Sequence, residues 1–205
     1  MNRRQFLAAS GSAAASLTVL AGLTVLNGCT VTGPGSSADA GEAAEKNTRR
    51  RREIEADVDA ALTRLYGTVK GSRELIGKSS AVLVFPEVVG AAFGVGGQYG
   101  RGALRAGGRT VGYFSTTAGS FGFQVGAQSR AIFYAFMTSG AYERFKRSSG
   151  WKVGADATVA LVKMGVNGQL DTSTAVNPIE AFVLTNAGLM AGASLEGAKV
   201  SRLDL

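Results

Sequence analysis

Few side chains in this chain are suited to chemistry, and their types narrow the range of functions. The sequence has one cysteine, Cys29, and no histidine. This removes the commonest general base, a second thiol, and the usual ligands of zinc, copper, haem and iron–sulfur clusters. A carboxylate or Ser–Lys enzyme stays possible, but the acidic residues are scattered and no Gly-x-Ser-x-Gly elbow occurs. We therefore expect a protein that is not an enzyme and needs neither metal nor cofactor.

Cys29 has no second cysteine with which to form a disulfide within the chain. It follows Leu26-Asn27-Gly28, after an apolar stretch too short and too diluted to reach the about 20 residues that span a bilayer. This ending resembles the lipobox of bacterial lipoproteins. The resemblance implies that lipid is attached to the Cys29 sulfur and that the chain is cut just before it. The alternative is an ordinary secretory signal with an incidental cysteine.

The first residues indicate export. The segment at residues 2–7 reads NRRQFL and resembles a twin-arginine signal, with general secretion as the alternative. We expect residues 1–28 to be a cleaved signal peptide, residues 29–41 a flexible lipidated tether and residues 42–205 one domain. The expected location is the periplasmic face of a bacterial envelope membrane. Thr30, in place of the aspartate that retains some lipoproteins in the inner membrane, favours the outer membrane.

Charge points to an acidic partner. Loss of Arg3 and Arg4 with the signal lowers the formal net charge from +7 to +5. A modest positive charge suits anionic lipid or an acidic polymer, and nucleic acid is not expected in a periplasm. We therefore expect membrane lipid as anchor and ligand, with an envelope protein as a further possible partner.

Two basic groups are candidates for contact with lipid headgroups. The first is the run Arg49, Arg50, Arg51 and Arg52, and the second is the set Arg101, Arg105 and Arg109 along one hairpin. Each has a structural alternative. The run could be a solvated helix start balanced by acidic residues one turn later. The hairpin set could be an ordinary exposed strand face.

The arginine run is predicted to lie on an amphipathic helix that spans Glu42–Lys70. Its apolar residues recur at helical spacing and form one stripe. They are Ile54, Val58, Ala61, Leu62, Leu65 and Val69. Gly71 should end this helix, and Ser72 should cap a short second one that runs through Ile76.

Glycine-rich strands dominate the rest of the chain. Bulky residues alternate with glycine over residues 93–102 and 121–126. Because glycine weakens a strand, so many glycines within strands need an explanation, such as strong bending, bulges or close approach of another element. A strongly curved antiparallel sheet or partial barrel supplies all of these. Gln98 and Gln128 should then point to the glycine side, where buried amides need partners.

The remaining elements complete an α+β fold, an amphipathic N-terminal helix packed on the curved sheet. Gly107-Gly108 should form a hairpin turn, and Ser139 should cap a helix that runs to Ser148. Pro86 should either end the strand that precedes it or mark that strand as an edge strand. The expected strands lie at residues 82–85, 131–137, 151–161, 179–184, 189–194 and 198–203.

Several uncommon glycine strings occur in an order that resembles the SYLF domain family, over about residues 60–203. They are LVFP at 83–86, FGVGGQYGRG at 93–102, GSFGFQVGAQ at 119–128, GADA at 154–157 and GLMAGASLEG at 188–197. The resemblance implies a compact, non-enzymatic α+β lipid-binding module. Some eukaryotic members of the family bind phosphoinositides with a basic amphipathic helix before the domain, and some fungal relatives bind actin.

Overall fold

The computed structural model describes residues 37–163, 170, 177–190 and 192–205, without the side chains of residues 37–39, 91–95 and 120–127. Cys29, the predicted signal peptide and most of the predicted tether lie outside the described residues. Residues 37–205 form one compact unit. Both clusters of buried apolar residues lie inside this unit, between Ile54 and Val200. A chain that begins at Thr30 therefore keeps every core residue that the structure describes.

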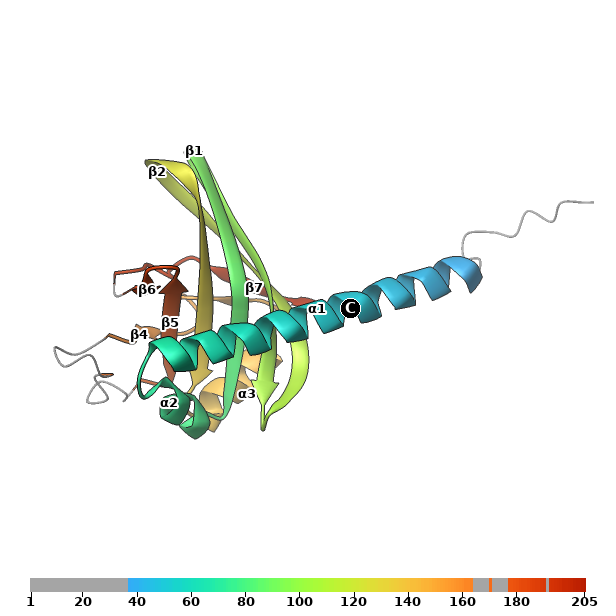
Figure 1. The fold of residues 1–205 in the computed structure, drawn as a ribbon, viewed down its shortest axis with the longest axis horizontal. Coiled ribbons are helices and arrows are strands. Elements are labelled where there is room, and N and C mark those ends of the chain that lie inside the picture. The colour runs from blue at the N-terminus through green and yellow to red at the C-terminus, as the bar shows by residue number, and fades with distance from the viewer. Residues whose placement is uncertain (1–36, 164–169, 171–176, 191) are drawn as a thin grey trace, which may run out of the picture. The chain divides into compact units, whose positions relative to one another are not determined.

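Helix α1 spans Ser37–Thr68 and begins within the segment predicted to be tether. Its predicted apolar stripe is confirmed. Ile54, Val58, Ala61 and Leu65 are buried, and Leu62 packs at the edge of the core. Residues 40–53, by contrast, are exposed or half-exposed. In Figure 1 this first part of α1 extends away from the sheet.

The link from α1 to helix α2, which spans Ser72–Lys78, differs from the prediction. Gly71 precedes α2 in a left-handed conformation, with φ of +86°. The Ser72 hydroxyl does not cap α2; it donates to the Val69 carbonyl at 2.6 Å, near the end of α1. The same carbonyl also accepts from the Ser72 amide at 3.2 Å, so Ser72 binds it through both backbone and side chain. Helix α2 also continues past Gly77, which the prediction placed outside the helix.

Two long strands form a ribbon that folds over on itself. Strand β1 (Ala81–Ala106) pairs antiparallel with strand β2 (Arg109–Phe136) from one end to the other. Gly107 and Gly108 join them with positive φ, which confirms the predicted hairpin turn. The ribbon bends sharply in its middle (Figure 1). An added Cβ at Gly102 would lie only 1.9 Å from the Val84 carbonyl oxygen, so the two ends of β1 touch. This close approach is one of the three reasons predicted for the glycines.

Pro86 does not end a strand but lies on an edge strand, the second of the two predicted outcomes, because β1 pairs only with β2 among the described strands. Strand β1 continues through it, with a shift of register between Phe85 and Val88. Because proline cannot donate to the ladder, it is tolerated at such an irregularity. The segments predicted as separate strands at residues 82–85 and 93–99 are thus one bent strand.

Five shorter strands complete a seven-stranded sheet around β2. Strand β5 (Ile179–Thr185) pairs with the second half of β2, and β7 (Lys199–Leu203) pairs with its first half. The segment predicted as a central strand, residues 131–137, therefore lies between β1 and β5. Three short strands sit at the edges: β3 (Trp151–Lys152), β4 (Ala160–Leu161) and β6 (Gly188–Leu189). All pairs are antiparallel except β4 with β5.

Three other predictions for the second half of the chain were wrong in detail. The strand expected over residues 151–161 is broken, because Gly154 turns with φ of +90° and the Asp156 carboxylate accepts a hydrogen bond from the Lys152 amide. The strand expected at 189–194 stops at Leu189. Helix α3 (Ser139–Arg147) is capped by Thr138, whose hydroxyl accepts from the Ala141 amide, and not by Ser139.

The curled sheet buries an apolar cluster on each face. The outer cluster joins α1 and α2 to residues such as Val84, Phe133 and Phe182. The inner cluster includes Tyr134, Phe136, Phe145 of α3 and Trp151, whose rings contact one another. The predicted α+β architecture is confirmed: an N-terminal helix packs on a strongly curled, mostly antiparallel sheet that forms a half-barrel.

Candidate functional site

The first basic group lies on the exposed part of α1. The Arg49 side chain is 72% exposed, and its Nε atom is 3.8 Å from the Glu53 carboxylate. Arg52 is exposed, and Arg50 is half-buried. The Arg51 guanidinium lies 5.9 Å from the centre of the Tyr113 ring. These arginines stand just before the first buried residue of the helix, Ile54, so the core does not depend on them.

Two polar contacts fasten α1 to the ribbon one to two turns after this run. Tyr113 on β2 donates its hydroxyl proton to the Glu55 carboxylate at 2.7 Å. Arg105 on β1 contacts the Asp59 carboxylate at 2.6 Å. Burial of the Tyr113 ring, aided by its hydrogen bond and proximity to Glu55, raises the pKa of its hydroxyl to about 12. Both contacts hold the helix at the edge of its apolar stripe.

The second basic group does not form one uniform strip. Arg101 and Arg109 are exposed, but the Arg105 side chain is only 17% exposed and is paired with Asp59. Its charge is therefore offset by a carboxylate that lies 46 residues earlier in the chain. Sequence spacing placed the three arginines together, whereas the structure assigns Arg105 to the attachment of α1.

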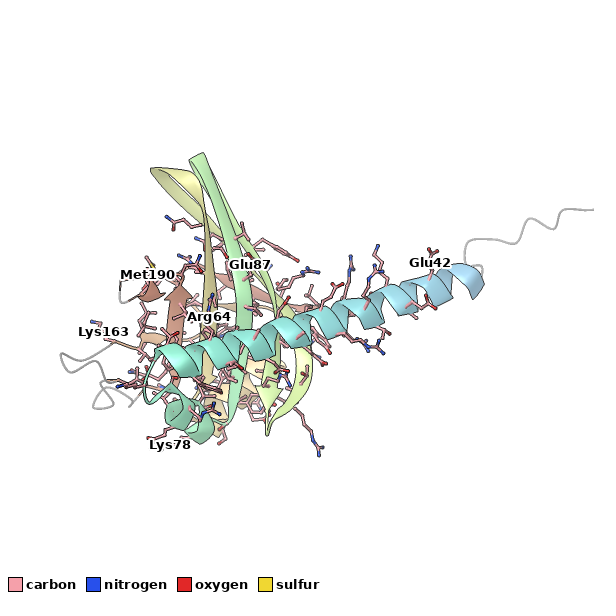
Figure 2. All side chains as sticks on the ribbon, viewed as in Figure 1. Glu42, Arg64, Lys78, Glu87, Lys163 and Met190 are labelled. Atoms are coloured by element: carbon pink, nitrogen blue, oxygen red, sulfur yellow. The ribbon has the colours of Figure 1, made fainter. Side chains whose placement is uncertain are left out.

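A groove of about 880 Å³ runs between α1 and β1, and the sequence reasoning missed it. Its apolar part includes Ile54, Pro86 and the exposed side chains of Val89 and Tyr99. Its charged residues are Arg101 and the three acids Glu53, Asp57 and Glu87. The acidic excess opposes an anionic ligand here. Figure 2 shows Glu87 on β1.

A second, smaller cavity of about 280 Å³ lies inside the curl of the sheet. It lies between the two halves of the folded ribbon and the segment before β7. The guanidinium of Arg130 on β2 donates a hydrogen bond to the Gln98 side-chain carbonyl on β1. The expectation that Gln98 needs a partner on the glycine side is confirmed, while Gln128 is exposed. Arg130 was missed; the available signal was one arginine directly before the apolar run 131–136.

No described helix has both the length and the apolar character needed to cross a membrane. Within the same part of the chain, no group of three or more acidic, histidine or cysteine side chains is arranged to hold a metal ion.

Comparison with known families gives one match. No curated protein matches the chain significantly. Residues 117–204 match the sequence profile of the Ysc84 family, which is described as Las17-binding protein actin regulator. The matched segment begins within β2 and ends just after β7. It therefore contains strands from the centre of the sheet, and this part of the chain is similar to the Ysc84, or SYLF, domain family.

Proposed function

We propose that this protein is a non-enzymatic lipid-binding module, anchored through Cys29 to the periplasmic side of an envelope membrane, that favours anionic lipid. The lipobox-like sequence before Cys29 supports the anchor. The Ysc84/SYLF match supports the class of module. Thr30, directly after the lipidated residue, favours the outer membrane.

The observation that carries the proposal is the position of Arg49–Arg52 on α1. The apolar stripe of the helix is already packed on the sheet from Ile54 onward. Residues 40–53 contain no large apolar residue, so this stretch has no apolar face to insert into a bilayer. Three of its arginines are nevertheless exposed, Arg50 is half-buried, and all four lie outside the core. Attraction of basic side chains to an anionic surface is worth about 1 kcal/mol per residue.

The contact with the membrane is therefore electrostatic at this site. Screening shortens the reach of such charges from about 10 Å at 0.1 M salt to about 3 Å at 1 M. The acidic residues Glu42 and Glu45 oppose the attraction earlier in the helix (Figure 2 labels Glu42 near its free end). Binding through the arginine run should hence be moderate alone and should add to the anchor, because two weak membrane signals act together.

Co-sedimentation with vesicles tests the proposal without the anchor. A chain that begins at Thr30 is mixed with vesicles of phosphatidylcholine, with or without phosphatidylglycerol, at 0.05 and 0.5 M NaCl. We expect sedimentation with the anionic vesicles at low salt, much less at high salt, and little with neutral vesicles. Failure to bind anionic vesicles at low salt would contradict the lipid-binding function.

The anchor is tested separately in cells. Metabolic labelling with a fatty acid should mark the parent chain and leave the Cys29→Ser variant unlabelled. Equal labelling of both proteins would refute lipid attachment at Cys29. This test is independent of the vesicle test, because that chain lacks Cys29.

A second candidate function is favoured by the family description, Las17-binding protein actin regulator, which names a protein partner. On this alternative the chain is an interaction protein of the envelope and uses lipid only as an anchor. The same chain from Thr30, fixed to lipid-free beads, should then retain a specific envelope protein. That retention, together with no sedimentation with vesicles, would favour the alternative.

A further inference from the structure

The cavity inside the curled sheet is suited to a small anionic group. The ribbon strands contribute Val88, Gln98, Thr116, Arg130 and Ile132 to its wall, and Glu196 comes from the segment before β7. Val88 and Ile132 belong to the inner apolar cluster, so one part of the wall is apolar. Residues far apart in sequence meet here only because the ribbon folds over.

Arg130 forms no ion pair among the described residues, although Glu196 also lies on the cavity wall. The Arg130 side chain is half-buried, and no described carboxylate lies within ion-pair distance of it. Glu87 precedes Val88, the residue of β1 that pairs with Arg130, and it accepts a hydrogen bond from the Ser129 hydroxyl. A cation withdrawn from water is normally compensated by an opposite charge. The position is therefore stabilised when an anion enters the cavity.

The cavity wall offers several hydrogen-bond donors to an anion. A guanidinium has five N–H groups, and the described residues account for one bond, to the Gln98 carbonyl oxygen. That bond orients the Gln98 side chain and leaves its amide N–H groups available. The Thr116 hydroxyl adds a further donor on the cavity wall. Guanidinium and amide donors that converge are suited to a phosphate oxygen, because charge-assisted hydrogen bonds are short and strong.

A buried hydroxyl also lies on the same strand face, although its residue, Tyr134, is not part of the cavity wall. Tyr134 follows Arg130 by four residues, so the two side chains point to the same face of β2. Its ring is fully buried between Phe85 and Trp151. Its hydroxyl has no hydrogen-bond partner among the described residues. Unpaired buried hydroxyls are uncommon and call for an explanation, such as a missing ligand or water.

Size limits what the cavity can hold. Pockets for drug-sized ligands occupy about 300–1,000 Å³, and this cavity, at about 280 Å³, is at the small end. It has room for a phosphate with a glycerol-sized substituent and not for acyl chains. A lipid could therefore place only its headgroup here.

We propose that the cavity inside the half-barrel is a headgroup subsite, in which Arg130 and Gln98 bind the phosphodiester of an anionic phospholipid. This inference rests on the proposed lipid-binding function and assigns it a second contact, separate from the arginine run on α1. Glu196 sets a preference among phosphates. Its carboxylate repels a second negative charge, so a singly charged diester binds better than a doubly charged phosphate.

Two isosteric substitutions give the sharpest test. Gln98→Glu places a carboxylate beside Arg130 and supplies the missing counter-charge from within the protein, so it should keep the fold and abolish anion binding. Gln128→Glu makes the same change of charge on an exposed position of the ribbon and should leave anion binding unchanged. Arg130→Met removes the cation itself.

The measurement is an NMR titration of the chain from Thr30 with glycerophosphoglycerol, the soluble headgroup of phosphatidylglycerol, and with inorganic phosphate. We expect saturable shifts at Gln98 and Arg130 in the parent, with the diester the tighter ligand. Gln98→Glu and Arg130→Met should each weaken binding at least tenfold, while their melting temperatures show whether they fold. Absence of saturable shifts in the parent, or equal affinity in Gln98→Glu, would overturn the subsite.

Vesicles separate this subsite from the proposed function. Phosphatidylglycerol vesicles should compete with glycerophosphoglycerol for the cavity. A smaller fraction of the Gln98→Glu variant than of the parent protein should sediment with these vesicles. If vesicles bind the parent but do not compete, the cavity serves a free phosphate and the headgroup assignment fails while lipid binding stands. If vesicles do not bind the parent at all, the proposed function fails even where the soluble titration succeeds.

Discussion

The two halves of α1 have the same helical backbone conformation but different roles. From Ile54 onward, every apolar position of the stripe is used in packing, and Glu55 and Asp59 bind to the ribbon. Before Ile54, the helix has no large apolar residue and carries four arginines in the exposed part of the molecule. The comparison separates a half that stabilises the domain from a half that is free to contact something else.

The largest effect on stability should come from the packed half. Leu65→Ala removes a fully buried side chain from the outer cluster and should lower the free energy of unfolding by about 2–5 kcal/mol. Thr48→Ala, at an exposed position of the other half, should change it by about 0.5 kcal/mol or less. Urea unfolding followed by circular dichroism measures both. Similar losses at the two positions would abolish the distinction between the halves.

The largest effect on membrane binding should come from the exposed half. Replacing Arg49–Arg52 with glutamine should weaken low-salt binding to anionic vesicles by up to about 4 kcal/mol on the per-residue estimate, and by less where contact is incomplete. The free energy of unfolding should barely change, because surface charges contribute little. Co-sedimentation and urea unfolding of the same sample test both statements. Parent-like sedimentation at low salt would exclude the arginine run as the contact.

Two ion pairs on α1 give a smaller contrast. Asp59 meets Arg105 at 2.6 Å, with the arginine side chain 17% exposed, whereas Glu53 meets Arg49 at 3.8 Å with both side chains mostly exposed. Asp59→Asn should therefore destabilise the domain by about 1 kcal/mol, and Glu53→Gln by almost nothing. Thermal unfolding at low and high salt distinguishes them. Equal effects would show that Arg105 is not part of the attachment.

The smallest effect concerns alkaline pH. The pKa of Tyr113 is raised from 10.0 to about 12 in the folded protein by burial and by Glu55. Because the folded pKa is above the unfolded one, this contribution to stability is complete below pH 10 and is lost as pH rises from about 10 to 12. Tyr113→Phe should be slightly less stable at pH 8 and should lose stability less steeply above pH 10. Urea unfolding at pH 8, 10 and 11.5 tests this, and equal slopes would contradict it.

The helix and the need for curvature could be read from the sequence because both follow from local patterns. A helical period at Ile54, Val58 and Leu65 requires one buried face wherever the helix packs. Repeated glycine within strands requires a close contact, which the approach of Gly102 to Val84 supplies. The interruption after Trp151 was missed because alternation of apolar residues does not reveal a turn made by Gly154 and the Asp156 side chain. Pro86 lies on an edge strand, one of the two predicted outcomes, and does not end it, because a shift of register accommodates the proline within β1.

Some features of the candidate sites could likewise be read from the sequence, and others could not. The sequence by itself determined the lipobox-like Cys29, the arginine run, the lack of histidine and of a second thiol, and the apolar stripe, since each depends on residue types and short spacings. Only the tertiary structure decided which charges are balanced. Arg105 is neutralised by Asp59, 46 residues away, while Arg130 meets Gln98, 32 residues away, without a described carboxylate. Such pairings depend on how the ribbon folds over, because the interaction of two charges is set by their distance in space and by the solvent between them.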